Sequence, residues 1–404
     1  MISRRHLLQT AGAAGALAGL PSFLRARTAG PALTPGVPPG VGSYAAMASL
    51  PGKKPLIRLA DRPPNYESPL EYLRTPITPN DQFFVRYHLS DIPEVKAETY
   101  RIKVGGDGAN GHVELTLDDL KTMPAVEVVA VNQCSGNRRG LSQPHVAGVE
   151  WGYGAMGCAR WKGARLKDIL DKVGLKKECI EVGFNGADGP AYDKTPDFVK
   201  SIPTWKAVDP DTIVAYEMNG QPLPHFNGFP ARLIVPGWTG TYWMKHLTDI
   251  EARISPLGNF WMATAYRIPV GKFPIVARFI SQEAVASTPI TEMVVNSLIT
   301  SHRDGAKVNA GKLTVSGLAW DGGYGIRRVA VSTDGGKSWS DAKLGEDLGK
   351  YAFRPFSFGL TAKRGRNTIM VNATNAIGQT QVSQLIFNPA GYHNNVMQSI
   401  TLNA

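Results

Sequence analysis

The residue with the clearest chemical potential is Cys134. It follows a run of β-forming residues, 126–131, and is trailed by Gly136 and by the paired arginines Arg138 and Arg139. Neighbouring guanidinium charge favours the thiolate, which is the form that binds soft metals or attacks electrophiles. A lone cysteine is otherwise most often a buried, inert side chain. The loop therefore predicts an activated thiol, acting either as a metal ligand or as a nucleophile.

A second group of chemically capable residues lies at 83–88. Strand alternation would place Phe84, Arg86 and His88 on one face. A guanidinium group offers paired donors and a permanent charge to a tetrahedral or pyramidal oxyanion. The competing interpretation is a surface arginine in a salt bridge. With Cys134, this face predicts a site that combines a thiol with an anion cradle.

The sequence lacks the motifs that are typical of several other chemistries. The eight histidines and three cysteines show no C-x-x-C or H-x-x-x-H spacing, so neither zinc nor c-type haem is expected. No G-x-S-x-G elbow, Walker loop or G-x-G-x-x-G fingerprint is present, which disfavours hydrolases, NTPases and dinucleotide enzymes. Three cysteines are also too few for a disulfide framework.

The elements that must position these residues can be predicted in outline. Residues 126–131 form a strand candidate that runs straight into the Cys134 loop. The stretch 164–175 has apolar residues at 166, 169, 170 and 173 and then Gly174, which is typical of an amphipathic helix and its stop. Short β-like runs with a few such helices fill residues 80–275. Before them, residues 31–79 are rich in Pro and Gly and predict an extended, irregular lead segment.

From about residue 278 the pattern changes to alternating strands separated by Gly-rich turns. The runs 313–320, 329–333 and 368–374 alternate apolar and polar residues, and the Asp-Gly-Gly sequences at 321–323 and 334–336 are hairpin signals. These features predict a β-sandwich of immunoglobulin-like size over residues 278–404.

Composition and the first thirty residues indicate where in the cell the protein is located. The chain has 404 residues, of which 43% are hydrophobic and 19% charged, and a net charge of +11. Residues 1–30 match a twin-arginine export signal, with Arg4 and Arg5 before a short apolar run. Removing the four arginines of this segment leaves +7. No segment is long enough to span a membrane, and no basic stripe with interleaved aromatics indicates nucleic-acid binding. We expect a periplasmic protein.

Several motifs together carry a family resemblance. They are Phe-Phe-Val-Arg-x-His (83–88), Gln-Cys-Ser-Gly-Asn-Arg-Arg (133–139), Ala-Arg-Trp-Lys-Gly-Ala-Arg-Leu (159–166), Tyr-Glu-Met-Asn-Gly-Gln-Pro-Leu-Pro (216–224) and Ser-Thr-Asp-Gly-Gly-Lys-Ser-Trp (332–339). In order and spacing they resemble the sulfite oxidase family of molybdopterin enzymes. The resemblance implies an α+β fold, with a molybdopterin-binding domain at 80–275 followed by a β-sandwich dimerisation domain.

The resemblance also assigns roles to individual residues. Cys134 would be the thiolate ligand to molybdenum, with further sulfur ligands from the dithiolene of one pyranopterin. The substrate pocket would comprise Arg86, Cys134, Arg139, Trp151 and Tyr266. The pterin and its phosphate would be held by Phe84, Val85, Arg86, Tyr87, His88, Asp188, Asn227, Arg232, Trp243, Met244 and Lys245. Structural interpretations remain open for several of these, such as a core Trp151, a turn at Asp188 or a strand-bracing Arg232. Cys158 and Cys179 match no ligand position and are interpreted as buried structural thiols.

Two positions depart from the family pattern. Ala390 stands where some members carry a pocket arginine, which leaves one anion contact missing or replaced. Asn227 stands where a histidine is expected, although His225 lies two residues away. The chain also lacks the His-Pro-Gly-Gly motif of the cytochrome b5-type domain, so we expect no haem in this chain.

The resemblance implies oxidation of sulfite to sulfate, with electrons passed to a c-type cytochrome. A homodimer formed through the β-sandwich is expected, with a stable cytochrome complex as the rival. The alternative enzyme is an exported molybdenum reductase acting on sulfoxide or nitrate. A non-enzymatic oxyanion-binding or adhesion module would instead contain no molybdenum.

Overall fold

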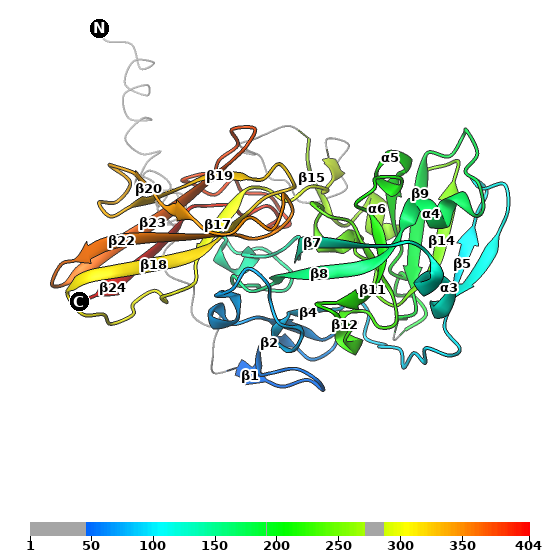
Figure 1. Cartoon of the computed structure of the whole chain (residues 1–404), viewed down its shortest axis with the longest axis horizontal. Coiled ribbons are helices and arrows are strands. Elements are labelled where there is room, and N and C mark those ends of the chain that lie inside the picture. The colour runs from blue at the N-terminus through cyan, green and yellow to red at the C-terminus, as the bar shows by residue number, and fades with distance from the viewer. Residues whose placement is uncertain (1–45, 191, 271–286) are drawn as a thin grey trace, which may run out of the picture.

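The computed structural model describes residues 46–190, 192–270 and 287–404. Figure 1 shows two bodies side by side, a mixed α/β body built from the earlier residues and an elongated all-β body that ends at the C-terminus. The early strands β1 to β4 lie beneath the junction of the two bodies. The predicted signal at 1–30 falls outside the described residues, as do residues 271–286, which include the predicted boundary between the two domains.

The segment expected to be an irregular lead contains ordered strands, so that expectation was wrong for residues 47–67. Its strands form a four-stranded antiparallel sheet with the strand that carries Arg86, in the order β1 (Met47–Ala48), β2 (Leu56–Ala60), β3 (Asn65–Glu67), β4 (Val85–Arg86). Leu56 and Tyr66 pack there against Val85 and Tyr87 in a small apolar core. Burial of these four side chains supplies the order that the Pro-rich composition did not predict.

Two five-stranded sheets make up the rest of the mixed body. One has the order β10-β9-β14-β5-β6, in which only the β14–β5 pair is parallel. Its strands are β5 (Arg101–Gly105), β6 (Val113–Thr116), β9 (Glu181–Gly186), β10 (Lys200–Pro203) and β14 (Leu247–Arg253). The other has the order β12-β11-β8-β7, with one further strand on β11. Its strands are β7 (Ala125–Gln133), β8 (Met156–Arg165), β11 (Ile213–Met218), β12 (Gln221–Pro222) and β13 (Arg232–Ile234).

Short helices complete this body, and they are α3 (Leu117–Thr122), α4 (Leu166–Asp171), α5 (Thr204–Ala207) and α6 (Phe260–Ala263). The predicted helix at 164–175 is confirmed as α4, although its first two residues belong to β8. Leu166, Ile169 and Leu170 are fully buried, as their spacing required. The predicted strand into Cys134 is confirmed as β7, which pairs along its whole length with β8.

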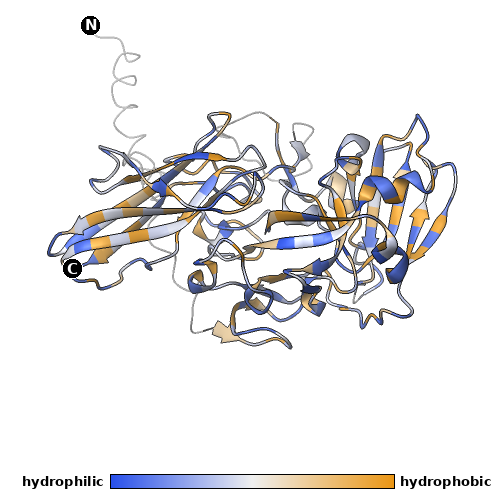
Figure 2. Ribbon diagram, in the orientation of Figure 1, coloured by the Kyte–Doolittle hydropathy of each residue, from blue (hydrophilic) through white to orange (hydrophobic). Residues whose placement is uncertain are grey.

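The second body is a β-sandwich of two four-stranded antiparallel sheets. One contains β17 (Asn296–Ile299), β18 (Gly311–Trp320), β22 (Arg354–Ala362) and β21 (Lys343–Leu344), and the other contains β20 (Ser340–Asp341), β19 (Ile326–Ser332), β23 (Arg366–Asn375) and β24 (Gln398–Asn403). Apolar residues of both sheets share one core. Hydropathy alternates along β18 and β22 (Figure 2), as expected for strands with one buried face.

Only one of the two predicted hairpin turns forms. Residues 334–336 lie in the connection between β19 and β20, which pair with each other. Asp321 instead lies between two strands of different sheets, because β18 and β19 do not pair. Its carboxylate accepts hydrogen bonds from the backbone of Gly323, Tyr324 and Gly325, and from the side chain of Asn375. Asp321 therefore caps a crossover between the sheets.

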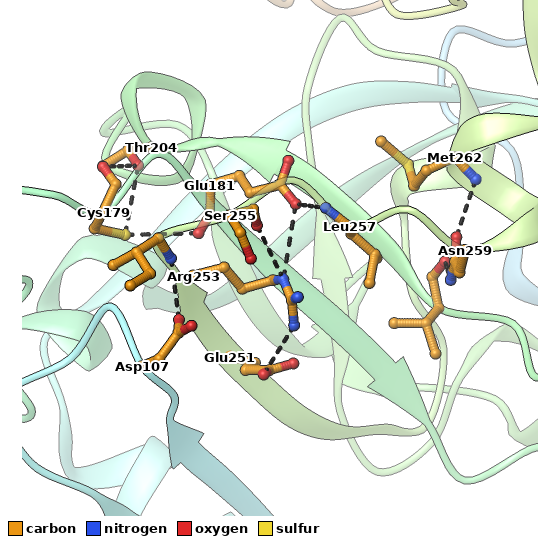
Figure 3. A network of polar contacts seen from close by, with 12 residues as sticks. Asp107, Cys179, Glu181, Thr204, Glu251, Arg253, Ser255, Leu257, Asn259 and Met262 are labelled. Carbon is orange, nitrogen blue, oxygen red and sulfur yellow. Dashed lines mark hydrogen bonds and ion pairs between the residues drawn. The ribbon is translucent and has the colours of Figure 1, made fainter.

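Cys158 and Cys179 are buried, as expected. Cys158 is fully buried, and burial raises the pKa of its thiol to about 12. Cys179 lies in a polar network just before the start of β9 (Figure 3). Its thiol contacts the backbone oxygen of Glu181 at 3.5 Å, and its own backbone oxygen accepts from the Thr204 hydroxyl group. In the same network Arg253 pairs with Glu251 at 2.9 Å.

Candidate active site

A cavity opens where β7 ends, and it gathers residues from most parts of the mixed body. It is lined by Phe83, Phe84, Arg86, His88, Asn132, Cys134, Ser135, Asp188, Phe198, Phe226, Asn227, Arg232, Gly240, Thr241, Trp243, Met244, Lys245 and Tyr266. Most of the residues expected at a substrate or cofactor site therefore lie together. The expected residues that do not line the cavity are Val85, Tyr87, Arg139 and Trp151.

The backbone holds Cys134 in place at the end of β7. Its N–H donates to the oxygen of Ala155 at 2.9 Å, and its own oxygen accepts from the N–H of Asn137 at 3.0 Å. The Asn137 side chain in turn accepts from the N–H of Ala155 at 3.1 Å. The Cys134 side chain is 8% exposed and lines the cavity. The Cys134 thiol is therefore nearly buried and lies at the cavity wall.

A buried carboxylate supports this loop from behind. Glu67, from β3, accepts a hydrogen bond from the N–H of Gly152 at 2.7 Å, and Gly152 accepts from the N–H of Arg138 at 2.8 Å. A Cβ atom at Gly152 would lie 2.8 Å from the Glu67 carboxyl group, so a larger residue there would displace that group. Burial raises the pKa of Glu67 to about 8, against opposing backbone hydrogen bonds.

Arg86, His88 and Tyr266 form a polar cluster in the cavity. Arg86 donates to the Tyr266 hydroxyl at 3.1 Å, and the same hydroxyl hydrogen-bonds Nε2 of His88. Burial lowers the pKa of Arg86, but Tyr266 and Cys134 raise it by more, so the guanidinium stays charged. Burial and then Arg86 hold the pKa of His88 well below its usual value, so the imidazole is neutral. Burial raises the pKa of Tyr266, which keeps the phenol protonated.

The backbone at Tyr266 is unusual. Its φ is +59°, a left-handed conformation that costs free energy for a residue with a side chain. The ring stacks on Tyr392 with centroids 5.6 Å apart and planes 9° from parallel. Strained backbone conformations cluster at functional sites. The packing around Tyr266 therefore holds its hydroxyl over the cavity.

The alternation predicted for residues 84–88 is confirmed. Phe84, Arg86 and His88 line the cavity. Val85 and Tyr87 point the other way, into the core of the first sheet. Their side chains do not line the cavity, and their assignment as cofactor-binding residues stays a prediction.

Arg139 and Trp151 lie behind the cavity wall. The Arg139 guanidinium donates to the oxygens of Ala390 at 2.7 Å and Val149 at 3.0 Å, and it stands 5.3 Å over the Tyr392 ring. Trp151 is fully buried in the same core cluster as Cys134. Arg139 is thus bound to the backbone of Ala390. The Tyr392 ring that it contacts lies beside Tyr266.

Two cations, Arg232 and Lys245, line another part of the cavity wall. Arg232 donates to the backbone oxygens of Asn227 at 2.8 Å and Trp243 at 3.0 Å, and burial lowers its pKa to about 9. Lys245 donates to the oxygen of Arg86 and lies 3.0 Å from the centroid of the Tyr87 ring. Burial holds the pKa of Lys245 well below its usual value, although Asp188 opposes this. Bound anionic charge would compensate these cations.

The wall of the cavity fits a polar ligand. Four of its residues carry a buried polar atom with no hydrogen-bond partner in the described part of the chain, and they are Asn132 (Oδ1), Ser135 (Oγ), Arg232 (Nε) and Thr241 (Oγ1). Buried polar groups are normally hydrogen-bonded. A pterin with a phosphate group offers both donors and acceptors to such atoms. The residues present therefore fit the cofactor that the resemblance implies.

Several residues of the site gave no signal in the sequence. Phe198 stacks face to face on the His88 ring at 3.5 Å, and Phe226 also lines the cavity. Lys53, from the segment expected to be irregular, donates to the side chain of Asn227 and to the oxygen of Asn80. Lys200 lies behind Tyr266. Ser135 could have been found, because it follows Cys134 directly.

Comparison with known families defines the class of protein. Residues 88–261 match the oxidoreductase molybdopterin-binding domain, and residues 287–404 match the dimerisation domain of molybdenum-cofactor oxidoreductases. These two domains coincide with the mixed body and the β-sandwich. The chain is thus a molybdopterin oxidoreductase with a dimerisation domain.

Individual relatives narrow the class. The chain is 32% identical to sulfite oxidase of Arabidopsis thaliana over 327 residues, which are 77% of this chain and 82% of that protein. It is 39% identical to human mitochondrial sulfite oxidase over 321 residues, 76% of this chain and 57% of the human protein, so it spans little more than half of that relative. The sulfane dehydrogenase SoxCD from Paracoccus pantotrophus shares the fold, with a TM-score of 0.75, 24% identity and 91% of each chain covered. The chain belongs to the sulfite oxidase family.

Residues 1–21 match a twin-arginine translocation signal, which confirms the predicted export route. Among the described residues, no helix is both long and apolar enough to cross a membrane.

Proposed function

We propose that the protein oxidises sulfite to sulfate at a molybdenum-pyranopterin centre. The observation that carries the proposal is the convergence of the Cys134 thiol, the charged Arg86 guanidinium and the Tyr266 hydroxyl in one cavity. A thiolate suits a soft metal, and a guanidinium group suits a pyramidal oxyanion.

The cofactor would occupy the part of the cavity that Cys134, Arg232 and Lys245 line. Cys134 would ligate the metal, Arg232 and Lys245 would pair with the pterin phosphate, and Ser135 and Thr241 would hydrogen-bond its polar edges. When bound, the molybdenum pyranopterin supplies a two-electron oxidation and transfer of an oxygen atom to the substrate. The negative charge of the phosphate would favour the charged forms of Arg232 and Lys245. It would therefore oppose the lowering of their pKa values by burial.

The chain's own contribution is position and charge. Arg86 would bind the sulfite anion, and its charge acts strongly because the cavity excludes most water. Neutral His88 and protonated Tyr266 share a hydrogen bond. Together they can hold a proton at the Tyr266 hydroxyl or pass it on as water enters and sulfate leaves. Phe198 packs on His88 and fixes its ring.

Each turnover converts sulfite and water to sulfate, two protons and two electrons. We propose that a c-type cytochrome in the periplasm accepts the electrons one at a time. The basic net charge of the chain favours an acidic docking surface on that partner. The β-sandwich, as an immunoglobulin-like dimerisation domain, would join two copies of the chain.

The test measures metal and activity on the same preparation. Purified protein should contain about one molybdenum per chain by elemental analysis and should reduce cytochrome c when sulfite is added. Reduced-dye assays with nitrate and with a sulfoxide run in parallel. Molybdenum with nitrate or sulfoxide reduction but no sulfite oxidation would replace the proposal with the reductase alternative. Folded protein expressed with molybdate yet lacking molybdenum would reject both.

A further inference from the structure

Behind Tyr266 lies a buried lysine that the proposed mechanism does not use. Lys200 begins β10, opposite Phe184 of β9, and is fully buried. Its ammonium group donates to the backbone oxygen of Trp261 at 2.6 Å. It also stands 4.8 Å from the ring centroid of Tyr242 and 5.2 Å from that of Tyr266. Lys200 thus lies over the ring of Tyr266, whose hydroxyl group accepts from Arg86.

This lysine has no acidic partner. Within the described residues, no carboxylate lies within ion-pairing distance of its ammonium group, and Trp261 supplies its one hydrogen bond. Burial, and then the nearby Arg267, lowers its pKa to about 7. Burying a lysine without a counter-charge is costly. Lys206, also nearly buried and only six residues on, shows the usual solution, because it pairs with Asp209 at 2.7 Å.

The positive charge of Lys200 acts on a residue that lines the cavity. Lys200 contributes to the low pKa of His88, so its field reaches the cavity. The face of an aromatic ring attracts a cation, which fixes the Tyr266 ring between Lys200 and the stacked Tyr392 ring. An anion bound in the cavity would be the missing counter-charge.

We propose that Lys200 is a positioning and anion-affinity residue, which holds the Tyr266 ring by lying over its face and supplies positive charge to the cavity. The inference rests on the proposed function only in taking the substrate to be a small oxyanion. Because the charge acts equally on bound substrate and on the reacting anion, its loss should raise KM and leave kcat nearly unchanged.

The experiment compares Lys200→Met with Lys206→Met in the molybdenum-loaded enzyme. Methionine nearly matches the length of the lysine stem and removes the charge. For Lys200→Met we expect the sulfite KM to rise roughly ten-fold, with kcat within about three-fold of wild type and molybdenum content unchanged. Lys206→Met should lower the Tm and leave KM at the wild-type value. Lys200→Gln provides a second uncharged variant if Lys200→Met does not fold.

A second readout measures anion binding without turnover. Added sulfate should raise the Tm of the wild type and of Lys206→Met, and should raise the Tm of Lys200→Met much less. A wild-type KM together with a wild-type sulfate response in Lys200→Met would overturn the role of Lys200. Equal losses of kcat and of molybdenum in that variant would also overturn it, by showing a merely structural role. If the wild type fails to oxidise sulfite but its sulfate response depends on Lys200, the proposed reaction fails and the anion role stands.

Discussion

The buried carboxyl group of Glu67 allows a quantitative test of how the Cys134 loop is held. Its side chain is 1% exposed, and it accepts from the backbone N–H of Gly152, next to the loop that carries Cys134. The perturbation is Glu67→Gln, which keeps the shape and one acceptor oxygen but cannot ionise. The matched control is Glu127→Gln on β7, where the carboxylate is partly exposed and pairs with Arg160 at 3.3 Å.

The sign of the effect follows from the pKa of Glu67, which burial raises from 4.5 to about 8. A raised carboxyl pKa means that the folded state binds the proton more tightly than the unfolded state. Stability from this group is therefore full below about pH 4.5 and is lost as the pH rises toward 8. At about 1.36 kcal/mol per pH unit, the loss between pH 5 and pH 7 is roughly 2.7 kcal/mol. For a domain of this size that corresponds to a Tm change of about 5 to 10 °C.

Calorimetry at pH 5 and pH 7 measures this effect as a difference between variants. The Tm of Glu67→Gln minus that of the wild type should increase by about 5 to 10 °C from pH 5 to pH 7. Glu127→Gln should show no such increase. Parallel pH dependences for Glu67→Gln and the wild type would show that the carboxylate is ionised in the folded protein, and the reasoning from burial would be refuted.

Three further predictions concern the cavity. Cys134→Ser should retain the pterin but lose sulfite oxidation, because an alcohol is a poor soft-metal ligand; Cys179→Ser is the control, and turnover in Cys134→Ser would exclude the metal-ligand role. Tyr266→Phe removes a hydrogen-bond partner of charged Arg86, at about 1.5 to 3 kcal/mol, so kcat/KM for sulfite should fall roughly 10- to 100-fold; an unchanged value would remove the hydroxyl from the mechanism. The charge of Arg139 reaches Tyr266 from behind the cavity wall, so Arg139→Gln should raise the sulfite KM with molybdenum content unchanged; an unchanged KM would confine Arg139 to its contacts with Ala390 and Val149.

Local spacing predicted the parts of the site that depend on a few consecutive residues. The strand into Cys134 and the helix that begins at Leu166 follow from periodicity, because each buries one face. Alternation correctly placed Arg86 and His88 on one face. The family motifs then indicated a molybdopterin oxidoreductase, because they contain the residues that line the cavity.

Residues brought together from distant parts of the chain could not be predicted in this way. Arg138 and Arg139 are adjacent in sequence, yet Arg138 turns to Asn296 and Val396 in the β-sandwich while Arg139 turns to Ala390. Nothing local distinguishes them. Only packing between the two bodies does, because each buried guanidinium must find acceptors.

The sequence by itself therefore determined the export signal, the two-domain order and the thiol that faces the cavity. The tertiary structure decided what surrounds that thiol. Glu67 and Lys200 reach the site from β3 and β10, and each is an ionisable group buried without a partner of opposite charge. Burial changes their proton affinities because it removes water from the charged form. That removal depends on the packing of segments far apart in the chain, which no local pattern of residues records.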